Sequence, residues 1–285
     1  MLNIANPQTT YVSDNTFAPA QQWFGSARAM REIILKESFR AHVGHIGSSL
    51  CVVDILEALF SQIIRADSPS DPNRDRFILS KGHAALALYT AFYFKGWISS
   101  EQLSTYHGNG TAFGVHPEPE TPGVDFGTGS LGQGLSLATG SALAARWQKS
   151  KRRVFTLMSD AECNEGSTWE AAMFAAHHKL ANLCAILDLN KQQAFGYTKD
   201  VINLPRLREI WQSFGWDVHE VNGHNVEQMV NVIAGLNFSN GRPHAILAHT
   251  VFGKGVSFME GQIKWHYSPL SEQELSQALL EVSKS

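Results

Sequence analysis

The chain has 285 residues and carries a net charge of −3 at pH 7, with 23 Lys plus Arg against 26 Asp plus Glu. Proteins that bind nucleic-acid phosphates concentrate positive charge, and this sequence has no long basic block, so we do not expect nucleic-acid binding. The composition is 44% hydrophobic and 17% charged. Such values are typical of a globular domain with a full core and argue against disorder.

The N-terminal segment, 1–18, lacks the basic and apolar parts of a signal peptide. We interpret it as a loosely held tail before one domain over 19–285. The longest uncharged stretch, 126–145, is rich in Gly, Ser and Thr, so no membrane-spanning helix is predicted. The three cysteines, Cys51, Cys163 and Cys184, fit neither a disulfide framework nor a metal-binding spacing. A reduced, cytoplasmic setting is therefore the expectation.

The first part of the chain predicts helices and one strand. Apolar residues recur at helical spacing over 20–41, and a second helix is predicted over 52–64. A short apolar strand, 76–80, leads through a Gly-His turn into a buried helix over 84–94. Residues 107–134 form a Gly- and Pro-rich connection, and a connection of that length in a compact domain is usually functional.

From residue 154 onward, strands and helices alternate regularly. The predicted strands cover 154–158, 183–189, 216–221 and 244–250, and the helices between them cover 167–179, 204–214 and 226–236. This alternation predicts an α/β fold: a doubly wound, mostly parallel sheet with helices on both faces. Ligands bind such sheets beyond the carboxyl ends of the strands, so the polar residues at those ends are the candidate site.

Two oxygen-bearing side chains follow successive strands of the predicted sheet. Asp160 follows strand 154–158 and Asn190 follows strand 183–189, a separation of one βαβ unit. Hard oxygen ligands of this kind suit Mg²⁺ or Ca²⁺. Taken singly, Asp160 is more readily explained as a helix cap and Asn190 as a turn residue. The two residues alone leave both explanations open.

The run Gly127-Thr-Gly129-Ser-Leu-Gly132 satisfies the G-x-G-x-x-G pattern of dinucleotide-binding proteins. That pattern must follow a strand and be trailed by an acidic residue about 20 positions later. Here a Pro-rich segment precedes it, and a basic segment, 149–153, lies where the acidic residue is needed. A nicotinamide cofactor is therefore not predicted.

The segment SDAECNEGSTWEAAMFAAHHKLANLCAILDLNKQQAFG, which begins at Ser159, resembles the thiamine diphosphate motif of transketolases. That motif begins with Gly-Asp-Gly and closes about thirty residues later with Asn. The segments AHVGHIGSSL, RFILSKGHAALALY, FGVHPE, DFGTGSLGQG and TVFGKGVSFME resemble further transketolase segments in the same order. The resemblance spans roughly residues 20–270. Ser159 and Ala161 stand where the family usually has glycine.

The resemblance implies thiamine diphosphate and Mg²⁺ as cofactors, with Ca²⁺ as a possible substitute. Asp160, Asn190 and the backbone carbonyl of Gln192 would hold the metal ion, and the backbone amide of Ala161 would approach the diphosphate. The loop residues that would contact the aminopyrimidine ring are Gly129, Ser130 and Leu131.

Four of the twelve histidines lie in turn segments at positions that match the family. Ketol transfer moves protons between sugar hydroxyls and a carbonyl, and imidazole titrates in the useful range. The resemblance implies that His83 and His266 also touch the diphosphate and that His45 and His116 face the sugar hydroxyls. The other eight histidines are interpreted as structural or exposed.

In full-length transketolases a glutamate that promotes cofactor activation lies in a second domain, which has no match in this sequence. We therefore expect an N-terminal subunit of a split transketolase, which transfers a two-carbon ketol unit between sugars that are phosphorylated or otherwise anionic. A C-terminal subunit would supply the missing domain in an α₂β₂ assembly, with Glu165 and Glu170 at the subunit interface.

Two alternatives remain. The α-subunit of a thiamine-dependent 2-oxo acid dehydrogenase shares the Asp-to-Asn metal motif, although His45 and His83 disfavour it. A degenerate, non-enzymatic cofactor-binding subunit is suggested by the replaced glycines at 159 and 161.

Overall fold

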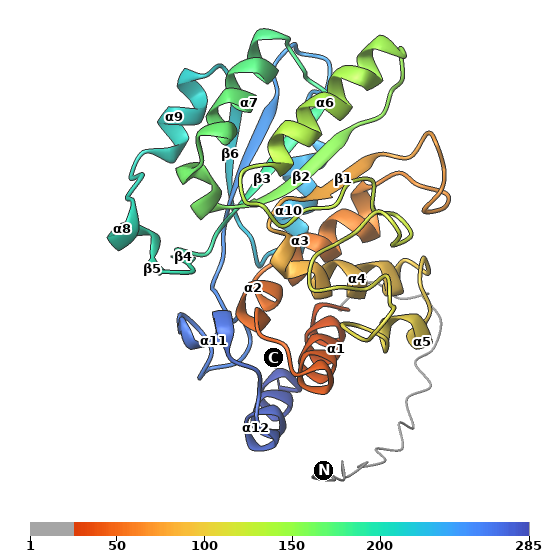
Figure 1. Cartoon of the computed structure of the whole chain (residues 1–285). Coiled ribbons are helices and arrows are strands. Elements are labelled where there is room, and N and C mark those ends of the chain that lie inside the picture. The colour runs from red at the N-terminus through yellow and green to blue at the C-terminus, as the bar shows by residue number, and fades with distance from the viewer. Residues whose placement is uncertain (1–25, 285) are drawn as a thin grey trace, which may run out of the picture.

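The computed structural model describes residues 26–284; the predicted tail and the start of the first predicted helix lie outside this range. Five strands form one sheet in the order β1-β2-β3-β7-β6, and every neighbouring pair runs parallel (Figure 1). The strands are β1 (Arg76–Leu79), β2 (Val154–Ser159), β3 (Leu183–Leu189), β6 (Asp217–Asn222) and β7 (His244–His249). The predicted α/β fold with a mostly parallel sheet is confirmed.

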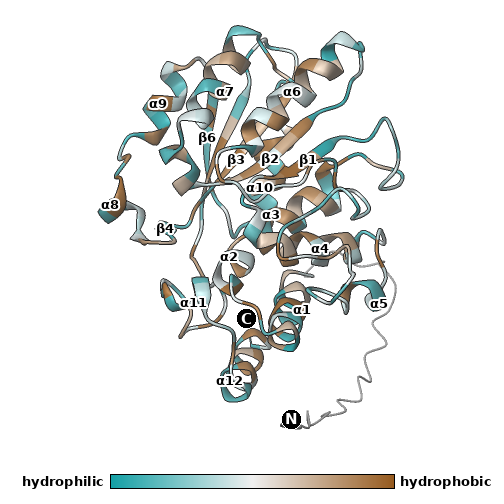
Figure 2. Ribbon diagram, in the orientation of Figure 1, coloured by the Kyte–Doolittle hydropathy of each residue, from teal (hydrophilic) through white to brown (hydrophobic). Residues whose placement is uncertain are grey.

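Helices cover both faces of the sheet, as predicted. One face packs against α6 (Gly134–Trp147), α7 (Gly166–His177) and α9 (Leu207–Ser213). The other packs against α1 (Ser26–Ala41), α2 (Ile46–Leu50), α3 (Val53–Ala58), the π-helix η1 (Leu59–Ile63), α4 (Ala85–Phe94), α10 (Val226–Ala234) and α12 (Glu272–Val282). Because both faces are covered, the central strands β2 and β3 are buried along their whole length and mostly apolar, with Asp188 as the charged exception. Figure 2 shows much of these strands in brown, the colour of hydrophobic residues.

Several short elements complete the fold. They are the 3₁₀ turns η2 (Gly82–Ala84) and η3 (Asp160–Asn164), the helices α5 (Ser100–Leu103), α8 (Thr198–Val201) and α11 (Lys264–Tyr267), and a hairpin of β4 (Gln192–Gln193) with β5 (Gly196–Tyr197). Residues 104–133 run through turns and bends, as the long connection predicted.

Neither α6 nor α12 is among the helices predicted from the sequence. The α6 segment is rich in Gly, Ser and Thr, which are poor helix formers, but its small residues Ala138 and Ala142 let it pack closely on the sheet. The start of α12 carries a readable signal, since Ser271 and Glu274 form a capping box. Tertiary packing explains why α6 was not predicted, and an overlooked capping motif explains why α12 was not.

The helical segment 46–63 is long and apolar enough to cross a membrane by length and composition, although no such span is predicted from the sequence. Inside the fold, 89% of it is buried. Its Asp54 carboxylate accepts a hydrogen bond from Arg31 Nη1 at 3.2 Å and lies 2.7 Å from His224 Nδ1. The segment is thus the central helix of the core on this face; Asp54 is paired, and its other charged residue, Glu57, accepts the backbone N–H of Ser26 at 3.3 Å.

Candidate active site

Three histidine rings meet beyond the carboxyl end of β1. His83 belongs to the turn η2 directly after β1, His45 precedes α2, and His266 lies in α11. The ring centroids are 5.3 Å apart for His45 and His83, 5.1 Å for His45 and His266, and 5.4 Å for His83 and His266. We call these three residues the histidine triangle. Segments that are distant in the sequence therefore build one cluster of imidazoles.

Close backbone approach holds the triangle together. The backbone N–H of His45 donates to the carbonyl of His266 at 3.2 Å, and His45 itself has a left-handed φ of 61°. A Cβ on Gly44 would lie 2.3 Å from the carbonyl oxygen of Tyr267, and one on Gly47 would lie 2.2 Å from the Phe252 ring. Only glycine fits at either position. The two glycines near the predicted helix end thus bring α2 against the segment that carries His266.

The fourth predicted histidine, His116, lies in the long connection beside this cluster. A Cβ on Gly129 would lie 3.2 Å from its Cδ2 atom, so the ring packs against the glycine loop. The hydroxyl of Tyr89 donates to the carbonyl of His116 at 3.1 Å. The structure therefore brings all four predicted histidines to one end of the sheet.

The triangle is built to stay uncharged near neutral pH. Burial, together with the charges of neighbouring groups such as Lys81, holds the pKa of His83 well below its usual value. Burial also lowers the pKa of His45, and it lowers that of His266 to about 4. A neutral imidazole offers one donor and one acceptor. Each ring can therefore accept a proton from a substrate hydroxyl directly, because its acceptor nitrogen is already unprotonated.

Asp160 and Asn190, the two predicted metal ligands, are adjacent and buried at the ends of β2 and β3. The Asp160 carboxylate accepts the backbone N–H of Ala161 and that of Lys191, each at 2.9 Å. The Asn190 Oδ1 atom accepts the backbone N–H of Gln192, also at 2.9 Å. The loop 190–192 therefore joins the predicted ligands into one group.

The electrostatics of this group suit a cation. Burial and the nearby charge of Asp188 raise the pKa of Asp160 to about 7. A bound divalent ion would relieve this repulsion, because an opposite charge favours the ionised carboxylate. Each oxygen that already accepts one N–H keeps a second lone pair. A carboxylate and an amide oxygen are ligands that Mg²⁺ prefers, so the donor set fits that ion.

A family model described as "Transketolase, thiamine diphosphate binding domain" matches residues 25–282. The chain belongs to this transketolase family. It is 41% identical to a subunit of the apulose-4-phosphate transketolase of Phocaeicola vulgatus, over 89% of this chain and 91% of the relative. It is 40% identical to the 6-deoxy-6-sulfo-D-fructose transketolase subunit SqwG of a Clostridium species, over 90% of this chain and 95% of the relative.

A solved transketolase from Campylobacter jejuni superposes with a TM-score of 0.85 at 30% identity. The match covers 90% of this chain and 42% of that structure. Human transketolase is 35% identical, with 90% of this chain and 41% of the relative covered. The chain thus spans about two fifths of these longer transketolases.

The transketolase fold here contains a buried charge network that sequence reasoning missed. Lys81 Nζ lies 2.5 Å from Asp188 Oδ2, and both side chains are fully buried. Asp188 also accepts from Asn190 Nδ2 at 2.7 Å and from the Cys51 thiol at 3.1 Å, as well as from the Thr250 hydroxyl. This network fixes the orientation of the Asn190 amide. Burial opposes ionisation of Asp188, but Lys81 holds its pKa below the usual value.

Glu162 is a second missed residue. Its buried carboxylate accepts the N–H of Gly132 at 2.9 Å and that of Ser159 at 2.8 Å, and it also accepts the Ser80 hydroxyl. It therefore ties the glycine loop to the ends of β1 and β2. Ser159, where the family usually has glycine, forms a capping box with Glu162 at the start of η3.

The remaining predicted residues lie around this centre. The backbone amide of Ala161, predicted to approach a diphosphate, here donates to the Asp160 carboxylate. Gly129 has a φ of 153°, and its loop neighbours Ser130 and Leu131 are exposed. The loop follows a segment of turns and bends at 104–126 rather than a strand. Glu165 and Glu170 are exposed on this chain, so their interface role stays a prediction.

Proposed function

We propose that this chain is the diphosphate-binding subunit of a two-chain transketolase that moves a two-carbon ketol unit from a ketose to an aldose. The observation that carries the proposal is the histidine triangle beside the Asp160 and Asn190 group, at one end of a sheet that belongs to the family. The two relatives named as subunits support it, because the match covers nearly their whole length.

Each group at the site has a role in this proposal. Thiamine diphosphate, when bound, supplies the electron sink for breaking a carbon–carbon bond next to a carbonyl. Asp160, Asn190 and the carbonyl of Gln192 would hold its Mg²⁺. His45 and His116 accept and return protons at the sugar hydroxyls, while the other two histidines of the site contact the diphosphate.

The substrates are proposed to be anionic sugars. One subunit relative is named for a sugar phosphate and the other for a sulfo sugar. The phosphate and sulfo groups named in both cases are anionic, although they lie on different sugars. We propose that the partner subunit contributes the basic residues that recognise this group and the carboxylate that activates the cofactor.

An aromatic rim beside the triangle supports a partner subunit. Phe195 is 86% exposed and Tyr267, next to His266, is 57% exposed. The Tyr267 hydroxyl donates to the carbonyl of Ala194, and the Tyr197 hydroxyl donates to that of Gly261 at 3.2 Å. These bonds tie the β4–β5 hairpin to the α11 segment. We propose that the partner covers this rim in an α₂β₂ assembly, with Glu165 and Glu170 buried at an interface.

The test is reconstitution. The full chain is purified alone and with the product of a neighbouring reading frame that resembles the rest of a transketolase, and ketol transfer is assayed with Mg²⁺ and thiamine diphosphate. We expect activity only from the mixture, and His45→Ala should lower it strongly. The matched control is His42→Ala, since His42 is exposed and also has a positive φ.

Several results would contradict the proposal. Full turnover by the chain alone would contradict the two-chain part. Cofactor binding without ketol transfer by the complex would favour the degenerate subunit. Decarboxylation of a 2-oxo acid would favour the dehydrogenase alternative.

A further inference from the structure

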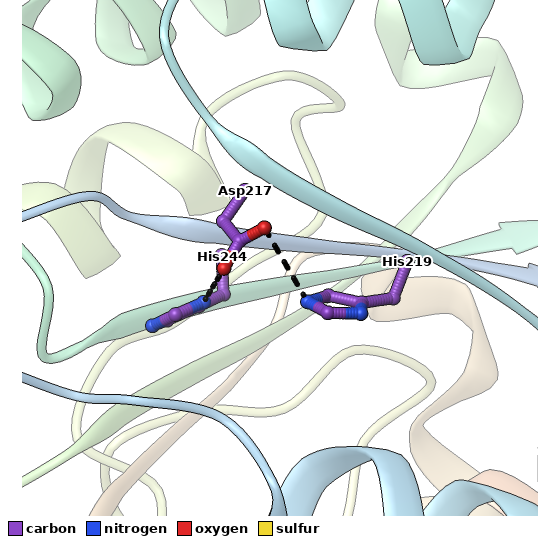
Figure 3. Close-up of side chains that lie close together, drawn as sticks. All are labelled: Asp217, His219 and His244. Atoms are coloured by element: carbon purple, nitrogen blue, oxygen red, sulfur yellow. Dashed lines mark ion pairs between the residues drawn. The ribbon is translucent and has the colours of Figure 1, made fainter. Parts of the chain in front are cut away.

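A second polar cluster lies at the opposite edge of the sheet. Asp217 and His244 are the first residues of β6 and β7 and pair directly in the parallel register, and His219 follows Asp217 by two positions. Because alternate residues of a strand point to the same face, all three side chains share one face of the sheet. Figure 3 shows the Asp217 carboxylate between the two imidazole rings.

The distances bring three potential metal ligands together. Asp217 Oδ2 lies 3.5 Å from His244 Nδ1, and Asp217 Oδ1 lies 3.6 Å from His219 Nε2. One ligand atom from each residue lies within 4.8 Å of the others. In a tetrahedral zinc site with bonds of about 2.0–2.1 Å, two ligand atoms are about 3.3 Å apart. The cluster is therefore close to that geometry.

The hydrogen bonds leave this cluster short of a positive charge. His244 is fully buried, and its Nε2 lies 3.2 Å from the carbonyl of Asn237, which requires that this nitrogen carry the proton. Its Nδ1 then presents a lone pair to the Asp217 carboxylate. Among the described residues, neither this Nδ1 nor His219 Nε2 has a hydrogen-bond partner, although both atoms are buried.

The repulsion that remains is between the lone pair of His244 Nδ1 and the Asp217 carboxylate, and protonation of His244 is a poor remedy for it. Burial holds the pKa of His244 below its usual value, so this ring resists becoming a cation. The bond to Asn237 is the outer contact that commonly fixes a metal-binding histidine in its tautomer. Two imidazole nitrogens and one carboxylate suit first-row divalent ions such as Zn²⁺ better than they suit Mg²⁺.

We propose that Asp217, His219 and His244 bind a Zn²⁺-type divalent ion, separate from the Mg²⁺ proposed at the other end of the strands. A solvent molecule would complete the tetrahedron, since Asp217 and His219 are about one third exposed. Within the described chain β6 pairs only with β7. The ion links these two strands, so its role is to fasten the edge strand.

The experiment measures Zn²⁺ binding by the full chain, saturated with Mg²⁺ and thiamine diphosphate so that the histidine triangle does not compete. We expect one tightly bound Zn²⁺ per chain, a higher melting temperature with Zn²⁺, and a visible absorption band when Co²⁺ replaces it. Asp217→Asn and His219→Gln should each weaken Zn²⁺ binding at least tenfold. Both side chains are partly exposed, so each variant is expected to fold without the metal.

The matched control is His249→Gln. His249 Nε2 lies 3.0 Å from Glu220 Oε2, so it forms a similar pair on the same two strands, but on the opposite face and beside Arg208. This variant should bind Zn²⁺ as the wild type does. Equal binding by the wild type and both cluster variants, or no Zn²⁺ bound by the wild type, would overturn the proposal. Loss of binding in the control as well would also overturn it.

Discussion

Replacing Asp160 by asparagine should stabilise the metal-free chain at pH 8, although the same change removes cofactor binding. The reason is the buried charge of Asp160 beside Asp188, which raises its pKa from 3.8 to about 7. A carboxyl group whose pKa is higher in the folded state destabilises that state whenever it is ionised. Without a metal ion, Lys81 and the N–H groups of Ala161 and Lys191 offset this cost only in part.

Two effects determine how much more stable Asp160→Asn is than the wild type. The pKa change corresponds to about 4 kcal/mol of destabilisation at pH 8, at about 1.4 kcal/mol per pKa unit. The asparagine keeps one oxygen, so one of the N–H bonds from Ala161 and Lys191 is lost, at about 1–3 kcal/mol. The electrostatic effect is larger, and we expect a net gain of about 1–3 kcal/mol in the free energy of unfolding.

Urea unfolding with a chelator present measures this difference, and the pH dependence identifies its cause. The folded chain binds the Asp160 proton between about pH 4 and 7, so the wild type recovers its lost stability as the pH falls through that window. The gap between variant and wild type should therefore shrink from pH 8 to pH 5. The buried histidines change the free energy of unfolding in the opposite direction as the pH falls. They do so in both proteins, so their contribution cancels in the difference between wild type and variant.

Ligand binding provides the complementary measurement. Mg²⁺ with thiamine diphosphate should raise the melting temperature of the wild type and leave that of Asp160→Asn unchanged. Asp200→Asn, an exposed carboxylate, is the control and should behave as the wild type does. A variant that is less stable than the wild type at pH 8 without metal would refute the reasoning, as would a gap that does not change with pH.

Three further predictions concern the other buried groups. Lys81→Met leaves Asp188 buried without its charged partner and should lower the free energy of unfolding in urea by about 3–5 kcal/mol. The control Lys199→Met, at an exposed ion pair, should lower it by almost nothing. Equal effects of the two variants would contradict the proposed role of the buried network. His116→Ala should keep cofactor affinity by calorimetry and lower ketol transfer by the complex by about 10²–10⁴-fold, and unchanged turnover would return this residue to a structural role. The His266 ring, with a pKa of about 4, should give constant NMR signals between pH 8 and 6 in the cofactor-free chain; titration in that range would contradict its burial.

The sequence predicted the sheet well because its strands are short apolar runs that end in polar residues. The predicted strand 183–189 coincides with β3, and the adjacency of Asp160 and Asn190 followed from the rule that parallel strands end at one edge. The histidine triangle was expected from family resemblance alone. Spacing along the chain does not relate His45 to His266, because only tertiary packing brings α2 to α11.

The missed residues share one physical cause. Lys81 and Glu162 read as ordinary charged residues near strand ends, and burial of a charge is a property of the folded chain. One signal was available, because Asp188 interrupts an otherwise apolar strand and a buried carboxylate needs a partner. The cluster of Asp217, His219 and His244 was overlooked for a related reason, since its members meet only through the register of β6 with β7.

The histidine triangle also sets an order of events during synthesis of the chain. Its members stand at positions 45, 83 and 266, so the first two leave the ribosome long before the third. At about 5–20 residues per second, the interval between His83 and His266 is about 10–40 seconds. During that time the segment around Gly47 lacks the Phe252 ring that later packs on it. Cofactor loading through this cluster therefore has to wait until His266 has left the ribosome, and until then the nascent chain holds an incomplete site.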